Sequence, residues 1–123
     1  YTAKDLDWRN KQSRSSLEMT DENSRPAVEN RVENMAQYDT VLVGFPIWWG
    51  VEPRIVDTFF DSYDFSGKTL IPFATSGGSG MGAAQKSVQA HCPAASWKNG
   101  RLVTAKNAAD WGREVLNGAA PQP

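Results

Sequence analysis

The sequence predicts an α/β fold built around a parallel β-sheet. Two mainly apolar runs, 40–45 and 69–75, are rich in β-branched side chains, and such runs are typical of strands buried on both faces. Stretches with helical periodicity alternate with these runs, and a strand–helix–strand order implies right-handed crossovers and parallel pairing. The chain has 123 residues, so we expect one domain spanning residues 1–123.

Two segments with different character precede the first strand. Residues 1–25 are polar and without period, which predicts an extended surface segment that Trp8 and Leu17 anchor to the body. Residues 26–118 then form the expected α/β core. Its first helix is predicted over 26–37, with Ser24 as the cap, Pro26 in the first turn and one apolar face made of Val28, Val32 and Met35.

The centre of the chain reads as strand, loop, helix and strand. Pro46 ends the first strand, and a loop rich in aromatic residues follows. A helix beginning at Pro53 places Ile55, Val56, Phe59, Phe60 and Tyr63 on one face, and Gly67 ends that stretch. The second strand contains Pro72, which has no N–H to donate, so we expect a local irregularity there.

The remaining elements follow a glycine-rich loop. A helix is predicted over 83–92, a short strand over 100–103, and a last helix capped by Asn107 with Trp111 and Val115 turned inward. Gly118 stands where a helix-ending glycine belongs. Residues 119–123 are expected to form a disordered tail.

Composition excludes several classes of function. The net charge is −1, so no basic surface predicts binding to nucleic acid or to anionic lipid. No apolar run approaches the ~20 residues that a membrane-spanning helix requires. The single cysteine, Cys92, excludes an internal disulfide and suits a reducing compartment, so we expect a cytoplasmic protein without membrane association.

Two loops carry the chemistry that the sequence predicts. Each follows the carboxyl end of a strand, and in open parallel sheets ligands bind at that edge. Trp48 and Trp49 offer a π surface to a flat ring, and a glycine-rich turn lets backbone N–H groups approach the rim of that ring. The candidate cofactor-binding residues are Pro46, Ile47, Trp48, Trp49, Gly50, Thr75, Ser76, Gly77, Gly78, Ser79 and Gly80.

These two loops resemble those of the flavodoxin family. The motifs are Phe45-Pro-Ile-Trp-Trp-Gly50 and Thr75-Ser-Gly-Gly-Ser-Gly80, and the likeness extends to the stretches 1–8 and 13–16. The resemblance implies a flavodoxin-like three-layer sandwich. It also implies flavin mononucleotide (FMN) bound non-covalently, both loops around its ring, and a redox partner protein that exchanges electrons with it.

The chain departs from the family pattern at its start. Family members begin with a strand and a Ser-x-Thr-Gly-Asn-Thr loop that holds the FMN phosphate, and residues 1–123 contain neither. We therefore expect a fold that lacks the N-terminal strands and FMN binding that is weak or lost. Strand 40–45 then has an open edge, and open edges pair. A missing segment, residues 1–25 or a second copy could cover it, and for a complete chain we expect a homodimer.

Other readings of the same residues stay open. Gly78–Ala83 also fits the dinucleotide pattern G-x-G-x-x-G/A, although Lys98 and Arg101 stand where an acidic residue is expected. The acids Glu52, Asp57, Asp61 and Asp64 are expected on a solvated helix face or, alternatively, near a flavin, whose potential they would lower. His91 and Cys92 are expected to be a helix-end imidazole and a packed thiol. One His and one Cys do not suggest a metal cluster.

The sequence therefore predicts an FMN-dependent electron carrier in which no residue is assigned a catalytic role. One alternative is an FMN-dependent NAD(P)H or quinone oxidoreductase on the same fold. Another is a flavodoxin-like remnant without flavin that serves in assembly.

Overall fold

The computed structural model describes residues 1–119, which alternate between helices and strands. In chain order the elements are α1 (Arg14–Thr20), the 3₁₀ helix η1 (Met35–Gln37), β1 (Thr40–Pro46), α2 (Arg54–Asp61), β2 (Thr69–Thr75), α3 (Gly82–His91), β3 (Ser96–Trp97), β4 (Arg101–Leu102) and α4 (Ala108–Ala119). The expected α/β fold class is confirmed.

The sheet is parallel throughout the described residues. β1 pairs with β2 over seven consecutive residues, from Thr40↔Thr69 to Pro46↔Thr75. β3 and β4 both pair with the other side of β2, so β2 is the central strand and β1 lies at an edge. Both strands predicted from apolar runs are therefore confirmed, and the only difference in their bounds is that β1 extends one residue further, to Pro46.

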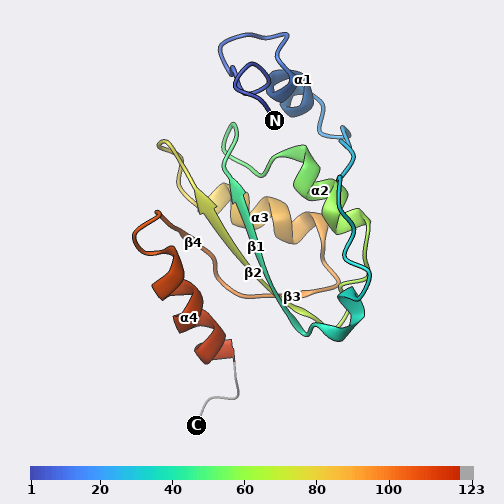
Figure 1. Cartoon of the computed structure of the whole chain (residues 1–123), viewed down its shortest axis with the longest axis vertical. Coiled ribbons are helices and arrows are strands. Elements are labelled where there is room, and N and C mark those ends of the chain that lie inside the picture. Colours follow the sequence, from blue (N-terminus) through green and yellow to red (C-terminus); the bar gives the residue numbers. More distant parts are fainter. Residues whose placement is uncertain (120–123) are drawn as a thin grey trace.

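Two apolar cores, one on each face of the sheet, make the fold three-layered. On one face Val43, Phe45 and Leu70 pack with side chains of α2 and α3, including Phe60 and Val88. On the other face the buried residues are Ile71, Val103 and Trp111, the last of these from α4. Figure 1 shows α2 and α3 together on one side of the strands and α4 on the other.

Pro72 causes the irregularity expected of it, on the side of β2 that faces β3 and β4. From Leu70 to Phe73 β2 advances three residues, while the paired chain advances four, from Trp97 to Arg101. This extra residue splits the edge into two short strands, as a bulge does. Gly100 packs against the backbone of Pro72 at this point. The approach is so close that a Cβ at Gly100 would clash with the Pro72 carbonyl oxygen.

The helix predicted over 26–37 is wrong. The structure has only the short helix η1 at the end of this stretch, so Ser24 caps nothing. Val28 and Val32 are 38% and 39% exposed, and only Met35 is buried. Asn and Val are weak helix formers, and these valines bury too little surface to compensate. The stretch instead runs beside α2, where the Val32 N–H donates to the Tyr63 hydroxyl (2.7 Å).

The expected anchors of the N-terminal segment are also wrong. Trp8 and Leu17 are 66% and 52% exposed. The segment contains α1, which the sequence reading missed, and the Ser13 hydroxyl caps this helix by accepting a hydrogen bond from the Ser16 N–H. The buried residues of α1 are Ser15, Ser16, Glu18 and Met19, three of them polar, and the aromatic contact of this segment with the body comes from Tyr1 rather than from Trp8.

The apolar face of the C-terminal helix follows the prediction, whereas the cap and the end do not. The Asn107 side chain bonds upstream rather than to the first turn. Trp111 is 6% exposed and Val115 packs against the same core. α4 begins directly after Asn107, whose side-chain oxygen accepts from the Thr104 N–H (2.8 Å). The helix continues through Gly118 to Ala119, so the stop at Gly118 is wrong. Of the predicted tail, Ala119 is helical and residues 120–123 lie outside the described residues.

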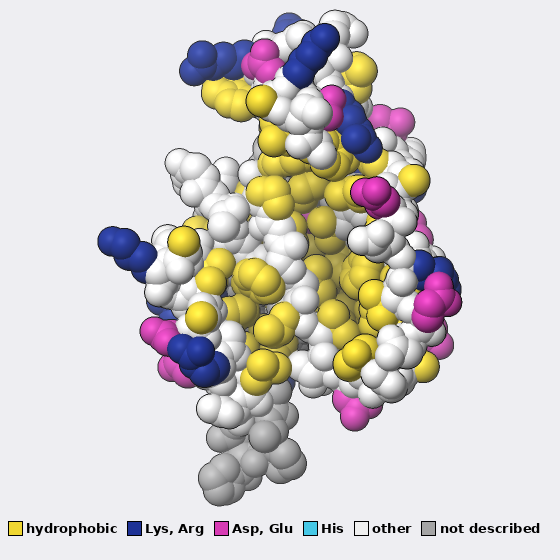
Figure 2. All heavy atoms as spheres, viewed as in Figure 1, with side chains coloured by type: hydrophobic (Ala, Val, Ile, Leu, Met, Phe, Trp, Pro, Cys, Tyr) yellow, Lys and Arg dark blue, Asp and Glu magenta, His cyan; other side chains and the backbone are white. Residues whose placement is uncertain are grey.

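The outer edge of β1 has no strand partner among residues 1–119. A groove of about 290 Å³ lies beside it, lined by Val28, Leu42, Val43, Gly44, Ile55, Val56 and Phe59. Figure 2 shows hydrophobic side chains gathered on this face, over β1 and α2. α1 lies beyond the carboxyl end of the sheet rather than over this edge (Figure 1). The homodimer through strand 40–45 stays a prediction.

None of the helices described here combines the length and the apolar composition that crossing a membrane requires.

The close approach at Pro72 generates a stability prediction. Gly100→Ala places a methyl group against a backbone oxygen that cannot rotate away, and we expect a loss of about 1–3 kcal/mol of unfolding free energy. Gly112→Ala in α4 is the matched control, because its Cβ meets nothing within 4 Å. That change should be neutral or stabilise by about 0.5–1 kcal/mol. Urea unfolding measures both, and equal effects of the two changes would contradict the assigned contact.

Candidate functional site

The two loops predicted to form a site lie side by side at the carboxyl edge of the sheet. β1 and β2 end in register, with Phe45 opposite Ala74 and Pro46 opposite Thr75. Just past the strand ends, the Ile47 N–H donates to the Thr75 carbonyl (2.9 Å) and joins the two loops directly. The parallel register therefore brings the loops 46–50 and 75–80 to one rim.

The tryptophan loop is a tight turn that exposes one indole. Trp48 and Val51 exchange two backbone hydrogen bonds, of 2.9 and 3.1 Å. Between them Trp49 and Gly50 both have positive φ, 51° and 87°, as a type I′ turn requires. Positive φ is uncommon for a bulky residue, and strained positions of this kind gather at functional sites. Trp49 is 54% exposed at the end of this turn.

The second tryptophan has a protein partner. Trp48 is half-buried, and the Tyr1 ring meets it edge to face with centroids 5.3 Å apart. Tyr1 is held by a hydrogen bond to Glu18 and by the Arg14 guanidinium, 4.0 Å above its ring. Burial, with the neighbouring Glu18 carboxylate, raises the pKa of Tyr1. The N-terminal segment therefore engages Trp48, whereas Trp49 presents the exposed indole.

The glycine-rich loop has an open backbone. Residues 75–80 are all exposed, and the Ser76 hydroxyl accepts from the Gly78 N–H (3.1 Å). A Cβ added to Gly77, Gly78 or Gly80 would meet nothing within 4 Å. A ligand can therefore approach this backbone closely. The two loops form an open rim, and a hollow of about 450 Å³ lies elsewhere, between the split edge strand and α4.

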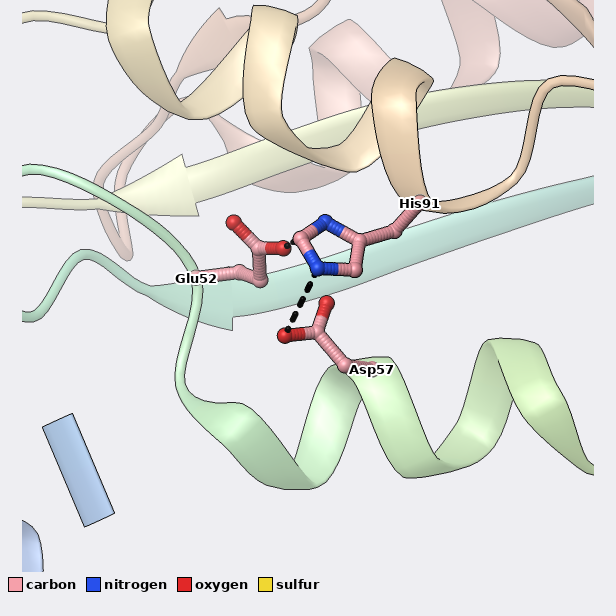
Figure 3. Close-up of side chains that lie close together, drawn as sticks. All are labelled: Glu52, Asp57 and His91. Carbon is pink, nitrogen blue, oxygen red and sulfur yellow. Dashed lines mark ion pairs between the residues drawn. The ribbon is translucent and has the colours of Figure 1, made fainter. Parts of the chain in front are cut away.

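A second cluster, which the sequence reading did not find, lies between α2 and α3. Glu52 precedes α2, Asp57 is in its first turn, and His91 ends α3. Figure 3 shows the three side chains pointing toward one another. His91 Nδ1 is 3.4 Å from Glu52 Oε2, and His91 Nε2 is 3.6 Å from Asp57 Oδ2.

This cluster corrects the expected environment of the acids. Glu52 and Asp57 are fully buried rather than on a solvated face, whereas Asp61 and Asp64 are exposed as that reading expected. Asp57 stands three residues before the buried Phe60, so the two share a helix face, and this spacing was the available signal. His91 at the helix end and the buried thiol of Cys92, whose pKa burial raises, match the prediction.

The electrostatics of the cluster favour a neutral carboxyl group. Burial, reinforced by the adjacent Glu52, raises the pKa of Asp57 to about 8, and Arg25 and Arg54 only partly oppose this shift. Within the described residues, the carboxylate oxygens of Glu52 and Asp57 have no hydrogen-bond partner. Arg54 contributes a distant contact, 3.9 Å from its Nη1 to Asp57 Oδ2, while its Nη2 donates to the Met19 carbonyl.

Comparisons with known proteins address the fold and family. Residues 1–117 match the flavodoxin family model. The structure is similar to a crystal structure of a candidate flavoprotein from Bacteroides uniformis ATCC 8492, with 49% identity, a TM-score of 0.84, and coverage of 92% of this chain and 74% of that one. A crystal structure of a candidate flavoprotein from Bacteroides eggerthii DSM 20697 is 45% identical, with a TM-score of 0.84, and the match covers 95% of this chain and 75% of that one.

A more distant likeness concerns the fold alone. A flavoprotein in complex with FMN from Lactobacillus acidophilus NCFM is 18% identical with a TM-score of 0.54, and the match covers 68% of this chain and 54% of that one. No curated protein matches the sequence significantly. The family match over nearly the whole chain, with two similar structures of 45% identity or more, shows that this chain belongs to the flavodoxin family.

Proposed function

We propose that this protein binds FMN non-covalently at the rim formed by the loops 46–50 and 75–80, and that it transfers electrons through the bound flavin. The observation that carries the proposal is the joining of the two loops by the bond from Ile47 to Thr75, with an exposed indole beside an open glycine backbone. Membership of the flavodoxin family and the likeness to two candidate flavoproteins support it.

The residues present fit the ring of a flavin. An isoalloxazine ring has two flat faces that stack on aromatic side chains, and its rim carries carbonyl oxygens and nitrogens that hydrogen-bond to backbone amides. Trp49 supplies the exposed aromatic face. The backbone of residues 76–80 supplies N–H groups that no side chain shields. The cofactor supplies the redox chemistry when bound, and the protein binds the ring, orients it and limits its contact with water.

The strained turn at Trp49 contributes to this role. Positive φ at Trp49 and Gly50 holds the indole at the rim before any ligand arrives. A side chain already placed in its binding orientation loses less entropy when the ligand binds. Trp48, in the same turn, is engaged edge to face by the Tyr1 ring.

A substitution at the exposed indole tests the ring contact. Trp49→Ala should weaken the binding of both FMN and riboflavin by about tenfold or more (~1.4 kcal/mol), because both ligands carry the same ring. Trp8→Ala is the matched control, because Trp8 is likewise exposed, at 66%, but lies outside the two loops. Quenching of flavin fluorescence measures each affinity. Unchanged affinity in Trp49→Ala would exclude stacking on this residue.

A second substitution tests the open backbone. Gly78→Val adds a side chain that meets no protein atom near its Cβ, so the unfolding free energy should change by less than about 0.5 kcal/mol. The added bulk should nevertheless reduce flavin affinity at least tenfold by keeping the ring from the backbone. Ala94→Val, at an exposed position of another loop, serves as the control. Wild-type affinity in Gly78→Val would contradict a role for this loop.

The carrier role has its own assay. The flavin-loaded protein is reduced chemically without oxygen and mixed with an oxidised one-electron acceptor protein, and the flavin absorbance reports the transfer. Rapid oxidation of the flavin without any NAD(P)H activity supports a carrier. Steady-state NAD(P)H consumption with a quinone acceptor would instead show the oxidoreductase alternative.

A further inference from the structure

The cluster of Glu52, Asp57 and His91 has a composition that packing alone does not explain. Two carboxylates with 0% exposed surface lie beside the apolar core of α2, α3 and the sheet, and the one buried arginine near them, Arg54, comes no closer than 3.9 Å to Asp57 Oδ2. Burying an ionised carboxylate without compensation costs several kcal/mol, so buried acids are normally paired, hydrogen-bonded or metal-bound. Among the described residues, no N–H or O–H group of another side chain or of the backbone donates to any of the four carboxylate oxygens, and the two carboxyl groups have only each other as close polar neighbours besides His91 and Arg54.

The orientation of the imidazole also indicates that a proton or a cation lies between His91 and Asp57. His91 Nδ1 is 2.9 Å from the Ser87 carbonyl oxygen, and because a carbonyl only accepts, Nδ1 must carry the proton. In the neutral ring Nε2 then has a lone pair, and this lone pair faces Asp57 Oδ2 at 3.6 Å. Two acceptor atoms at this separation repel each other unless a proton or a cation lies between them.

The arrangement also brings together three side chains that can bind a metal ion, and the 3.6 Å from His91 Nε2 to Asp57 Oδ2 is a spacing typical of two ligands of one ion. One ligand atom from each residue can be chosen so that all three lie within 4.8 Å of one another. Zn²⁺ binds oxygen and nitrogen ligands at about 2.0–2.2 Å, which corresponds to spacings of roughly 3.3–3.6 Å between tetrahedral ligands. A metal-bound imidazole usually donates its other N–H to a carbonyl or carboxylate, and the Ser87 carbonyl holds that position here.

We propose that Glu52, Asp57 and His91 form a binding site for a divalent first-row transition-metal ion, of the kind represented by Zn²⁺, between α2 and α3. One imidazole and two carboxylates favour such an ion over Mg²⁺, which prefers oxygen ligands and retains its waters. Two ionised carboxylates balance the charge of the ion. The His91 side chain is 29% exposed and gives the ion a route from solvent. The proposal does not depend on flavin binding.

The first experiment measures uptake of Zn²⁺. The protein is treated with a chelator, dialysed and titrated with ZnCl₂ by calorimetry, with thermal unfolding in parallel. We expect saturable 1:1 binding and a rise in Tm as the metal is added, because a ligand that binds only the folded state stabilises it. MgCl₂ at the same concentration should cause no comparable rise. Absence of saturable Zn²⁺ binding would overturn the proposal.

Substitutions assign the site. His91→Gln and Asp57→Asn should each lower Zn²⁺ affinity at least tenfold. Asp110→Asn, which changes an exposed acid on α4, and Cys92→Ser, next to His91, should retain wild-type affinity. Metal-free Asp57→Asn should be about as stable as the wild type, because a neutral amide of nearly the same size replaces the buried carboxyl group. Loss of the metal effect with an intact fold therefore cannot be ascribed to unfolding.

The competing explanation has a distinct outcome. If a shared proton rather than a metal ion occupies the cluster, Zn²⁺ changes the Tm of the wild type and of Asp57→Asn equally. Co²⁺ provides an independent readout, since bound Co²⁺ gives visible absorption bands that report its ligands. These bands should appear in the wild type and disappear in His91→Gln. Bands that persist in His91→Gln would place the ion elsewhere.

Discussion

The in-register parallel pairing of β1 with β2 is the interaction on which the rest of the structure depends. It runs from Thr40↔Thr69 to Pro46↔Thr75, so both strands end at the same level. A parallel pair needs a crossover, and α2 provides it on the face that also carries α3. A shift of one residue would turn Val43 and Phe45 away from the core and would separate the loops that Ile47 and Thr75 join.

The turn after β1 connects the two candidate sites. Trp48 and Val51 close it with two backbone hydrogen bonds, which hold Trp49 at the rim, and the next residue is the fully buried Glu52. The same local geometry therefore presents an aromatic ring to solvent and turns a carboxylate into the core. A flavin at the rim and a cation below it would be neighbours along the chain, bound through different residues.

Most of the fold could be predicted from local patterns. Apolar runs identified β1 and β2, and apolar side chains at helical spacing identified α2 and α4, because burial of one face leaves a periodic pattern in the sequence. The prediction of α3 depended on its place between the glycine-rich loop and Pro93. The predictions were wrong where the local pattern of apolar residues does not match burial in the fold. Val28, Val32 and Met35 have helical spacing, but two of them stay exposed. α1 was missed because three of its four buried residues are polar and leave no apolar periodicity. Pro72 predicted an irregularity in β2. Its form, an edge strand split into β3 and β4, depends on the neighbouring segment of the chain.

The sequence by itself determined the order β1, α2, β2, α3 and α4 and the two loops that meet at the carboxyl edge. Those properties follow from short-range periodicity and from the rule that parallel strands end together. Only the tertiary structure decided that Trp48 would lie under Tyr1, that Trp49 would stay exposed, and that His91 would close on Glu52 and Asp57. These outcomes depend on contacts between residues far apart in the chain. The burial of the two acids and their distances from His91 depend on how α2 packs against α3, and a local sequence pattern carries no information on that packing.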